Sequence, residues 1–156
     1  MDMRHSQRVL DSIRRIVRAL RLASRRAESR FGLSGAQLFV LQALRDGSSS
    51  TINELGERTY THQSSVSAVV TNLEEAGLIS RARSGSDARR REVRITPKGR
   101  KILNTRIELG QSRLVAGIAK LPNQERRLLA ALLERLVKES GFSDLPAKMF
   151  FEERKK

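Results

Sequence analysis

The chain contains no cysteine. Disulfides, thiolate zinc sites, cysteine nucleophiles and thiol-based redox sensing are therefore all excluded. Only two histidines occur, His5 and His62, in separate segments and without acidic residues at ligand spacing. We therefore expect no metal site and no cofactor.

Long apolar runs are also missing. The most apolar stretch near the start, residues 9–22, is interrupted by Asp11 and by four arginines. This pattern argues against a membrane-spanning helix and against a signal peptide, so we expect a cytoplasmic protein. The sequence also has no Ser-His-Asp pattern in a familiar context and no glycine-rich phosphate loop, so we do not expect an enzyme.

Negative charge is scarce relative to positive charge. The 156 residues include 31 Lys+Arg against 17 Asp+Glu, a formal net charge of +14. Apolar residues make up 38%, enough for one compact domain or two small lobes. Such a basic excess favours a polyanionic partner, most commonly nucleic acid, over the alternative of a protein with a merely basic surface.

Apolar residues recur every three or four positions in several segments, which predicts a mainly helical chain. A short strand is expected at residues 51–52, and a last apolar island follows in the tail at residues 145–151. Nine arginines occupy the other faces of the first helix. The expected helices cover residues 4–31, 35–44, 53–58, 62–76, 97–121 and 124–140.

The stretch from Thr61 to Thr96 combines a short helix with an arginine-rich hairpin. The helix has one apolar stripe, at Val66, Val69, Val70 and Leu73. Two short strands, at residues 78–83 and 91–95, flank a turn of small and polar residues. This helix and the small helix before it, at residues 53–58, form a helix-turn-helix pattern. This arrangement predicts a groove-reading helix beside a hairpin that contacts the DNA backbone.

The polar face of this helix supplies the candidate base contacts. Glutamine pairs bidentately with adenine, whereas serine accepts several bases, so the face is expected to read sequence weakly. Helix capping is an alternative role for Ser64, and Thr61 is expected to cap the helix and leave His62 facing phosphate. The candidates are His62, Gln63, Ser64, Ser67, Ala68 and Thr71.

The hairpin supplies the candidate backbone contacts. We expect Arg81, Arg83 and Arg91 to face phosphates, because lysine and arginine contacts release counterions condensed on DNA. Arg89 is the best candidate for insertion into a narrow minor groove, and Arg90 is the alternative. Arg89→Ala is expected to lower DNA affinity while leaving the fold intact.

Four segments together resemble the MarR family of winged-helix transcription regulators: LSGAQLFVLQAL (33–44), TINELGERT (51–59), SSVSAVVTNLEEAGLI (64–79) and DARRREVRITPKG (87–99). The last is similar to the family's wing signature, with an acid, an arginine two residues later and the pair Ile95-Thr96. The order of the elements also agrees over residues 5–140. Ala68 departs from the pattern, since many members have an arginine there.

The resemblance implies a mainly α fold with a small β wing. It implies a winged helix-turn-helix lobe at residues 33–96 and dimerisation helices at residues 5–31 and 97–151. A homodimer would bind a pseudo-palindromic operator on double-stranded DNA as a repressor released by a small anionic or aromatic ligand. Asp87 would pair with Arg89 and hold the wing in shape.

Three questions stay open at this point. Arg21, Phe31, Leu33 and Phe39 are weak candidates for a ligand pocket, and the simpler interpretation is that they fill the core. A low-specificity architectural nucleic-acid binder is an alternative function, and a protein-interaction module on the same fold is another. The apolar island of the tail indicates docking on a partner subunit.

Overall fold

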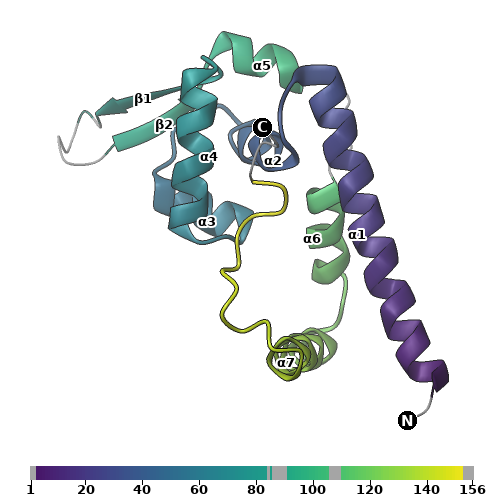
Figure 1. The fold of residues 1–156 in the computed structure, drawn as a ribbon. Helices are drawn as coiled ribbons and strands as arrows, with labels where there is room; N and C mark the ends of the chain where they lie inside the picture. Colours follow the sequence, from purple (N-terminus) through teal and green to yellow (C-terminus); the bar gives the residue numbers. More distant parts are fainter. Residues whose placement is uncertain (1–2, 84, 86–90, 106–109, 153–156) are drawn as a thin grey trace.

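A computed structural model of the chain describes residues 3–83, 85, 91–105 and 110–152 (Figure 1). The mainly helical fold with a small antiparallel wing is confirmed. The helices and strands of the described residues are α1 (Met3–Phe31), α2 (Gly35–Ala43), α3 (Ile52–Thr59), α4 (Gln63–Glu75), β1 (Ile79–Arg83), β2 (Arg91–Ile95), α5 (Pro97–Leu103), α6 (Gly110–Ala119) and α7 (Asn123–Glu139).

One hydrophobic core holds α2, α3, α4 and the hairpin together. The predicted apolar stripe of α4 is confirmed, since Val66, Val69, Val70 and Leu73 are completely buried. They pack in one cluster with the leucines of α2 and α3. Burying one side of α4 leaves its other side on the surface, which fixes the orientation of the candidate reading face.

Capping boxes define the starts of α2 and α3. Ser34 and Gln37 form a complete box at the start of α2. Thr51 forms a second box with Glu54, so α3 begins at Ile52 and the strand expected at residues 51–52 is wrong. The extended pairing occurs one residue earlier, at Ser50, whose backbone exchanges hydrogen bonds of 3.0 and 2.7 Å with Val93 of the hairpin.

The loop between α2 and α3 is tied down by charged groups. Arg58 donates to the carbonyl oxygen of Ala43 at 2.9 Å, at the end of α2. Hydrogen bonds from the hydroxyl and backbone N–H of Ser48, with Arg58 nearby, lower the pKa of Asp46. Any stability from this carboxylate is therefore present above its unfolded pKa and is lost only as the pH falls through the lower folded pKa.

The prediction of a single helix at residues 97–121 is wrong, because the helix is interrupted after Leu103. Thr96 and Pro97 start α5 as predicted, but α5 ends at Leu103 with Asn104 at its C-cap. The chain resumes as α6 at Gly110. Pro122 and Gly141 bound α7 as expected, and the positive φ of 72° at Gly141 explains why a glycine stands there.

Helices α1 and α6 pack side by side (Figure 1). A methyl group added at Gly110 would lie 3.1 Å from Cβ of Ala23 and 3.2 Å from Cα of Leu20. Gly110 therefore lies in close contact with α1. Glycine destabilises a helix relative to alanine, and the close packing against α1 offsets this cost. The sequence alone does not reveal this packing.

Large apolar faces stay uncovered outside the lobe. No residue of α7 is buried within the chain, and α1 also exposes Val9, Leu10, Ile16 and Val17. None of the described helices is both long and apolar enough to cross a bilayer. The exposed apolar residues of α7 are Leu128, Leu129, Leu132, Leu133, Leu136 and Val137.

The tail returns to the lobe of its own chain. Met149 is buried in the core, and Gln111 of α6 donates to the carbonyl oxygen of Phe150 at 2.8 Å. The rest of the predicted apolar island is more exposed, including Leu145 and Phe150. Docking of the tail on a partner subunit therefore stays a prediction, whereas docking on its own protomer is observed.

Candidate nucleic-acid interface

The first turns of helix α4 present a small, uncharged polar face to solvent, and Glu74 and Glu75 follow at the C-terminal end of the helix. Because Ser65, Val66 and Val69 turn inward, the intervening side chains point outward. No acidic residue lies in the first turn of α4. Such a face can approach the edges of base pairs without repelling the phosphates on either side. The exposed candidates from the sequence are His62, Gln63, Ser64, Ser67, Ala68 and Thr71.

A tight turn sets the angle between α3 and α4. The backbone N–H of Thr61 donates to the carbonyl oxygen of Gly56 at 2.9 Å. A methyl group at Gly56 would lie only 2.9 Å from the carbonyl oxygen of Thr61, so a larger residue would push the two helices apart. The residue between them, Tyr60, has a left-handed φ of 53°.

The N-cap of α4 is His62, which makes no side-chain capping bond. The expectation that Thr61 caps this helix is wrong, because its hydroxyl donates to the carbonyl oxygen of Thr59 at 2.9 Å. The start of α4 thus lacks a side-chain acceptor from its own N-cap. An uncapped helix start carries partial positive charge and favours a nearby phosphate.

Tyr60 is a candidate that sequence reasoning missed. It is 79% exposed, directly before the reading helix. A phenolic hydroxyl at this place can donate to a phosphate oxygen at the edge of the groove. The available signal was its position, since it is the one tyrosine of the chain and falls in the helix-turn-helix turn.

The hairpin brings two arginines together at the outer end of its ladder. Arg83 and Arg91 stand opposite each other in the register of β1 and β2, and both are exposed. Like charges directly opposite each other destabilise a two-stranded ladder. An anion between them removes this repulsion, so the pair is suited to a phosphate.

Arg81 faces the lobe rather than open solvent. Its guanidinium donates to the Thr71 hydroxyl at 2.8 Å, and its Nε lies 3.2 Å from a carboxylate oxygen of Glu74. The side chain is only 24% exposed. Arg81 therefore joins β1 to α4, an arrangement the sequence did not indicate. Direct DNA contacts by Arg81 and Thr71 stay predictions.

The base of the wing is held at the Ile95-Thr96 pair, where β2 ends. The Thr96 hydroxyl donates to the carbonyl oxygen of Gly77 at 2.8 Å and accepts from the backbone N–H of Gly99 at 3.1 Å. Lys98 donates to the carbonyl oxygen of Ala76 at 2.8 Å. The end of α4, the end of β2 and the start of α5 therefore meet at one hydroxyl group.

Thr96→Val is expected to lower the free energy of unfolding by about 1–2 kcal/mol, because both hydrogen bonds of the hydroxyl are lost at nearly constant shape. Urea denaturation monitored by circular dichroism measures the change. Thr61→Val removes only one local bond and serves as the control. Equal stabilities for the two variants would contradict the role assigned to Thr96.

Three candidates of the wing lie outside the described residues: Asp87, Arg89 and Arg90. Insertion of Arg89 or Arg90 into a minor groove, and support of the wing by Asp87, therefore stay predictions. In the described part of the chain, no group of three or more potential ligands is placed to hold a metal ion.

The four residues predicted for a ligand pocket do not surround one cavity. Arg21 lies in an outer groove on α1, and Phe39 lines a different cavity beside the tail. Leu33 is buried in the core, with Phe31 packed against it. The prediction is wrong because Arg21 lies on a solvent-exposed side of α1.

A different cavity of about 420 Å³ lies between α1 and α6. Its apolar lining includes Leu20 and Leu114, and two guanidinium groups, of Arg26 and Arg113, also line it. An apolar surface with adjacent cations suits a small aromatic or aliphatic anion.

Comparison with known proteins agrees with this geometry. Residues 31–90 match the family model described as the MarR family. The chain is 28% identical over 82 residues to the HTH-type transcriptional regulator SarZ from Staphylococcus epidermidis, covering 53% of this chain and 55% of SarZ. The match thus spans about half the length of that relative.

Two further matches cover more of the chain. It is 27% identical over 113 residues to the HTH-type transcriptional repressor MdtR from Bacillus subtilis, covering 72% of each chain. The crystal structure of the transcriptional regulator BldR from Sulfolobus solfataricus superposes with a TM-score of 0.57 and 27% identity, over 88% of this chain and 99% of that one.

Proposed function

We propose that this chain is a winged-helix transcription regulator of the MarR family that represses transcription as a homodimer bound to a pseudo-palindromic operator. The observation that carries the proposal is the pairing of two surfaces. The uncharged outer face of α4 lies next to a hairpin that ends in Arg83 and Arg91, and Arg81 ties the two together.

The two surfaces divide the work of recognition. Helix α4 enters the major groove, where Gln63, Ser64 and Ser67 meet base edges. The hairpin contacts the backbone through Arg83 and Arg91, which adds affinity but little sequence information. Because α4 offers no arginine or asparagine on its base-reading face, the shape of the DNA supplies much of the discrimination.

Dimerisation is supported by the uncovered apolar faces of α1 and α7. A contiguous apolar surface of this kind on a small protein marks an interaction site. Two copies joined through these helices would present two α4 helices to one side of a duplex. Half-sites are then expected about 10 bp apart, centre to centre.

A small anionic effector is a second part of the proposal. The cavity between α1 and α6 supports it, because this cavity adjoins a helix that dimerisation would use and combines apolar lining with Arg26 and Arg113. An aromatic carboxylate fits this combination of apolar and cationic groups. Binding there would alter the packing of α1 on α6.

Selection of bound sequences from a pool of randomised duplexes tests the proposal. We expect an inverted repeat, protected symmetrically in a footprint. A single half-site, or selection without sequence preference, would contradict it and favour an architectural binder whose specificity ratio is near one. No DNA binding at all would favour a protein-interaction module.

Paired substitutions then separate the two surfaces. Arg83→Ala with Arg91→Ala is expected to weaken binding to all sequences alike and to reduce the salt dependence of log K by about 0.9 for each phosphate contact removed. Gln63→Ala is expected to relax preference at one base pair and leave the salt dependence unchanged. The reverse pattern would refute this assignment.

A further inference from the structure

Positive charge is concentrated on α1 rather than on the winged lobe. Helix α1 carries nine arginines and two acids, a net charge of +7, which is half of the total of +14. The sequence of residues 32–105, which holds the lobe, has a net charge of only +4. Reading of DNA by α4 and the hairpin does not account for this distribution.

Four of these arginines form a row along one side of α1. Arg14, Arg18, Arg21 and Arg25 follow one another at intervals of four, three and four residues, the spacing of neighbours on a helix surface. They line one open groove. With a rise of 1.5 Å per residue, the row is about 16 Å long. We name it the α1 arginine row.

Among the described residues, three of the four arginines in the row have no counterion. Arg14 pairs with Asp11 at 2.9 Å, whereas within the part of the chain that the structure describes, no ion pair or hydrogen bond engages the side chains of Arg18, Arg21 and Arg25. All of them are exposed. Like charges three or four residues apart on a helix repel one another, so the row favours an external anion.

A second protomer does not supply the missing negative charge. Helix α6 contains no acidic residue, and α7 carries three acids against four bases. If either helix covered α1 in a dimer, the row would meet at best a nearly neutral surface. Because these two helices supply no net negative charge, the row favours an anion from another molecule.

We propose that the α1 arginine row binds the phosphate backbone of a second duplex DNA segment, separate from the segment read by α4. Duplex DNA carries one negative charge per about 1.7 Å of its axis, so a segment as long as the row offers several phosphates. Guanidinium groups bind phosphate through two parallel hydrogen bonds. An extended, purely cationic row fits an extended polyanion better than a small ion.

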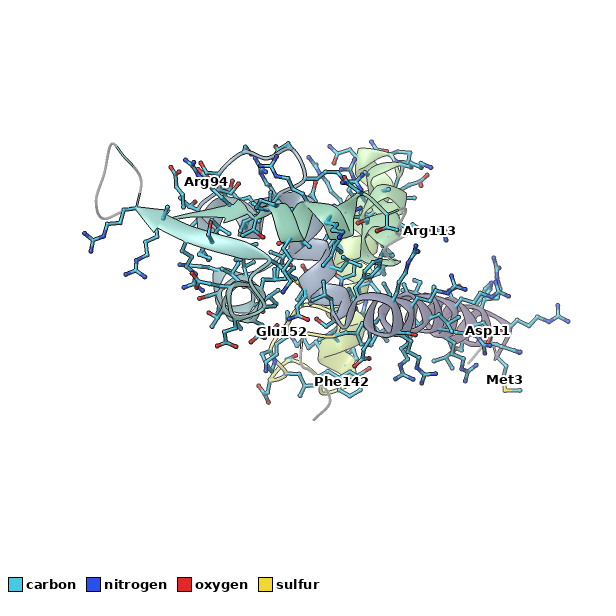
Figure 2. The ribbon with its side chains drawn as sticks, turned by 90° about the horizontal axis from the view of Figure 1, so that it is seen from above. Met3, Asp11, Arg94, Arg113, Phe142 and Glu152 are labelled. Atoms are coloured by element: carbon cyan, nitrogen blue, oxygen red, sulfur yellow. The ribbon has the colours of Figure 1, made fainter. Side chains whose placement is uncertain are left out.

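The position of α1 explains why a second segment is needed. Helix α1 lies on the side of the molecule away from the β1–β2 hairpin (Figure 1). Figure 2 shows the same separation from above, with Asp11 of α1 far from Arg94 of the hairpin. One straight duplex seated on α4 and the hairpin does not reach the row. The protein would thus hold two DNA segments together.

Anionic lipid is a poorer partner for this helix. A helix that lies on a membrane inserts its apolar side between the lipids. In α1 part of that side packs within the chain, where Leu20 and Ala27 are buried, and its exposed apolar residues are those assigned to the proposed dimer. In that dimer mainly the charge of the row is left for a further partner.

A two-duplex capture assay tests the inference with the full chain. A short duplex of about two helical turns is immobilised, the protein is added, and retention of a second, labelled duplex of random sequence is measured. The row variant carries Arg18→Gln, Arg21→Gln and Arg25→Gln. It is expected to retain at least about tenfold less of the second duplex than the wild type, with the thermal melt unchanged.

A matched control removes the same charge from elsewhere. Arg127→Gln, Arg135→Gln and Lys138→Gln take three positive charges from exposed positions of α7, and this variant should still capture the second duplex. In solution, the row variant should also show a salt dependence of random-duplex binding lower by up to about 2.7 per protomer. Equal losses in both variants would mean that only net charge matters and would overturn the proposal.

Two other results would also overturn it. A row variant with weaker self-association in sedimentation and unchanged capture would place the row against the partner subunit. Binding of wild type to phosphatidylserine vesicles without capture of a second duplex would identify a lipid surface instead. Failure of the proposed operator function looks different: sequence preference is then absent, while capture that depends on the row persists.

Discussion

Replacing Leu132 and Leu136 by aspartate is expected to separate the proposed homodimer into protomers and to abolish operator binding. Both leucines are exposed in the chain, at 54% and 41%. Together they contribute four side chains to a two-fold interface. Burying the exposed half of each side chain is worth about 0.8–1.5 kcal/mol, so the loss of all four removes about 3–6 kcal/mol. That equals about two to four decades in the dissociation constant.

Sedimentation equilibrium measures the protomer–dimer constant, and circular dichroism checks the fold. The lobe should stay folded, because no residue of α7 contributes to its core. Arg127→Asp is the matched control, since it adds an acid on the side of α7 opposite the apolar face and should leave the dimer intact. If the double variant sediments as wild type, α7 is not the dimer surface.

Gly99→Ala is expected to be the most damaging small substitution in the lobe. A methyl group there would overlap the carbonyl oxygen of Leu78 and lie 2.8 Å from Cγ1 of Ile95. Backbone on one side and core on the other leave it no room to shift. Overpacking of this kind costs about 3 kcal/mol or more. For a chain of this size the melting temperature should fall by about 6–12 °C.

Gly117→Ala provides the contrast for this measurement. Gly117 lies within α6, and no described atom stands within 4 Å of the added methyl group. Alanine should therefore stabilise the helix by about 0.5–1 kcal/mol. Calorimetry of both variants at one protein concentration gives the comparison. A stabilised Gly99→Ala protein would contradict the close packing of α5 on the lobe.

Much of the fold follows from local signals. The apolar stripe of α4, the capping box at Ser34 and the start of α5 at Thr96 depend on residues a few positions apart, so the sequence reveals them. The outward face of α4 follows directly from the stripe, which is why Gln63 and Ser67 were found as candidates. Their exposure is an observation, whereas their contact with bases is a prediction.

Other features depend on residues distant in the chain. Arg81 was expected to face phosphate, yet the register of β1 beside α4 places it against Thr71 and Glu74. The packing roles of Gly99 and Gly110 become evident only from the tertiary contacts at these two positions. The ligand-pocket prediction was wrong for a related reason, because Arg21 and Phe39 line different cavities.

Arg81, Thr96 and Lys98 form hydrogen bonds that fix the hairpin to α4 and to the residues that follow it. Helix α4 and the hairpin therefore have little freedom to move relative to each other. The angle between the groove contacts of α4 and the backbone contacts of the hairpin is set when the chain folds. Any signal that weakens DNA binding must then change the distance between the two winged lobes of the proposed dimer. Operators with different spacer lengths, rather than base changes within one half-site, would measure that change in distance.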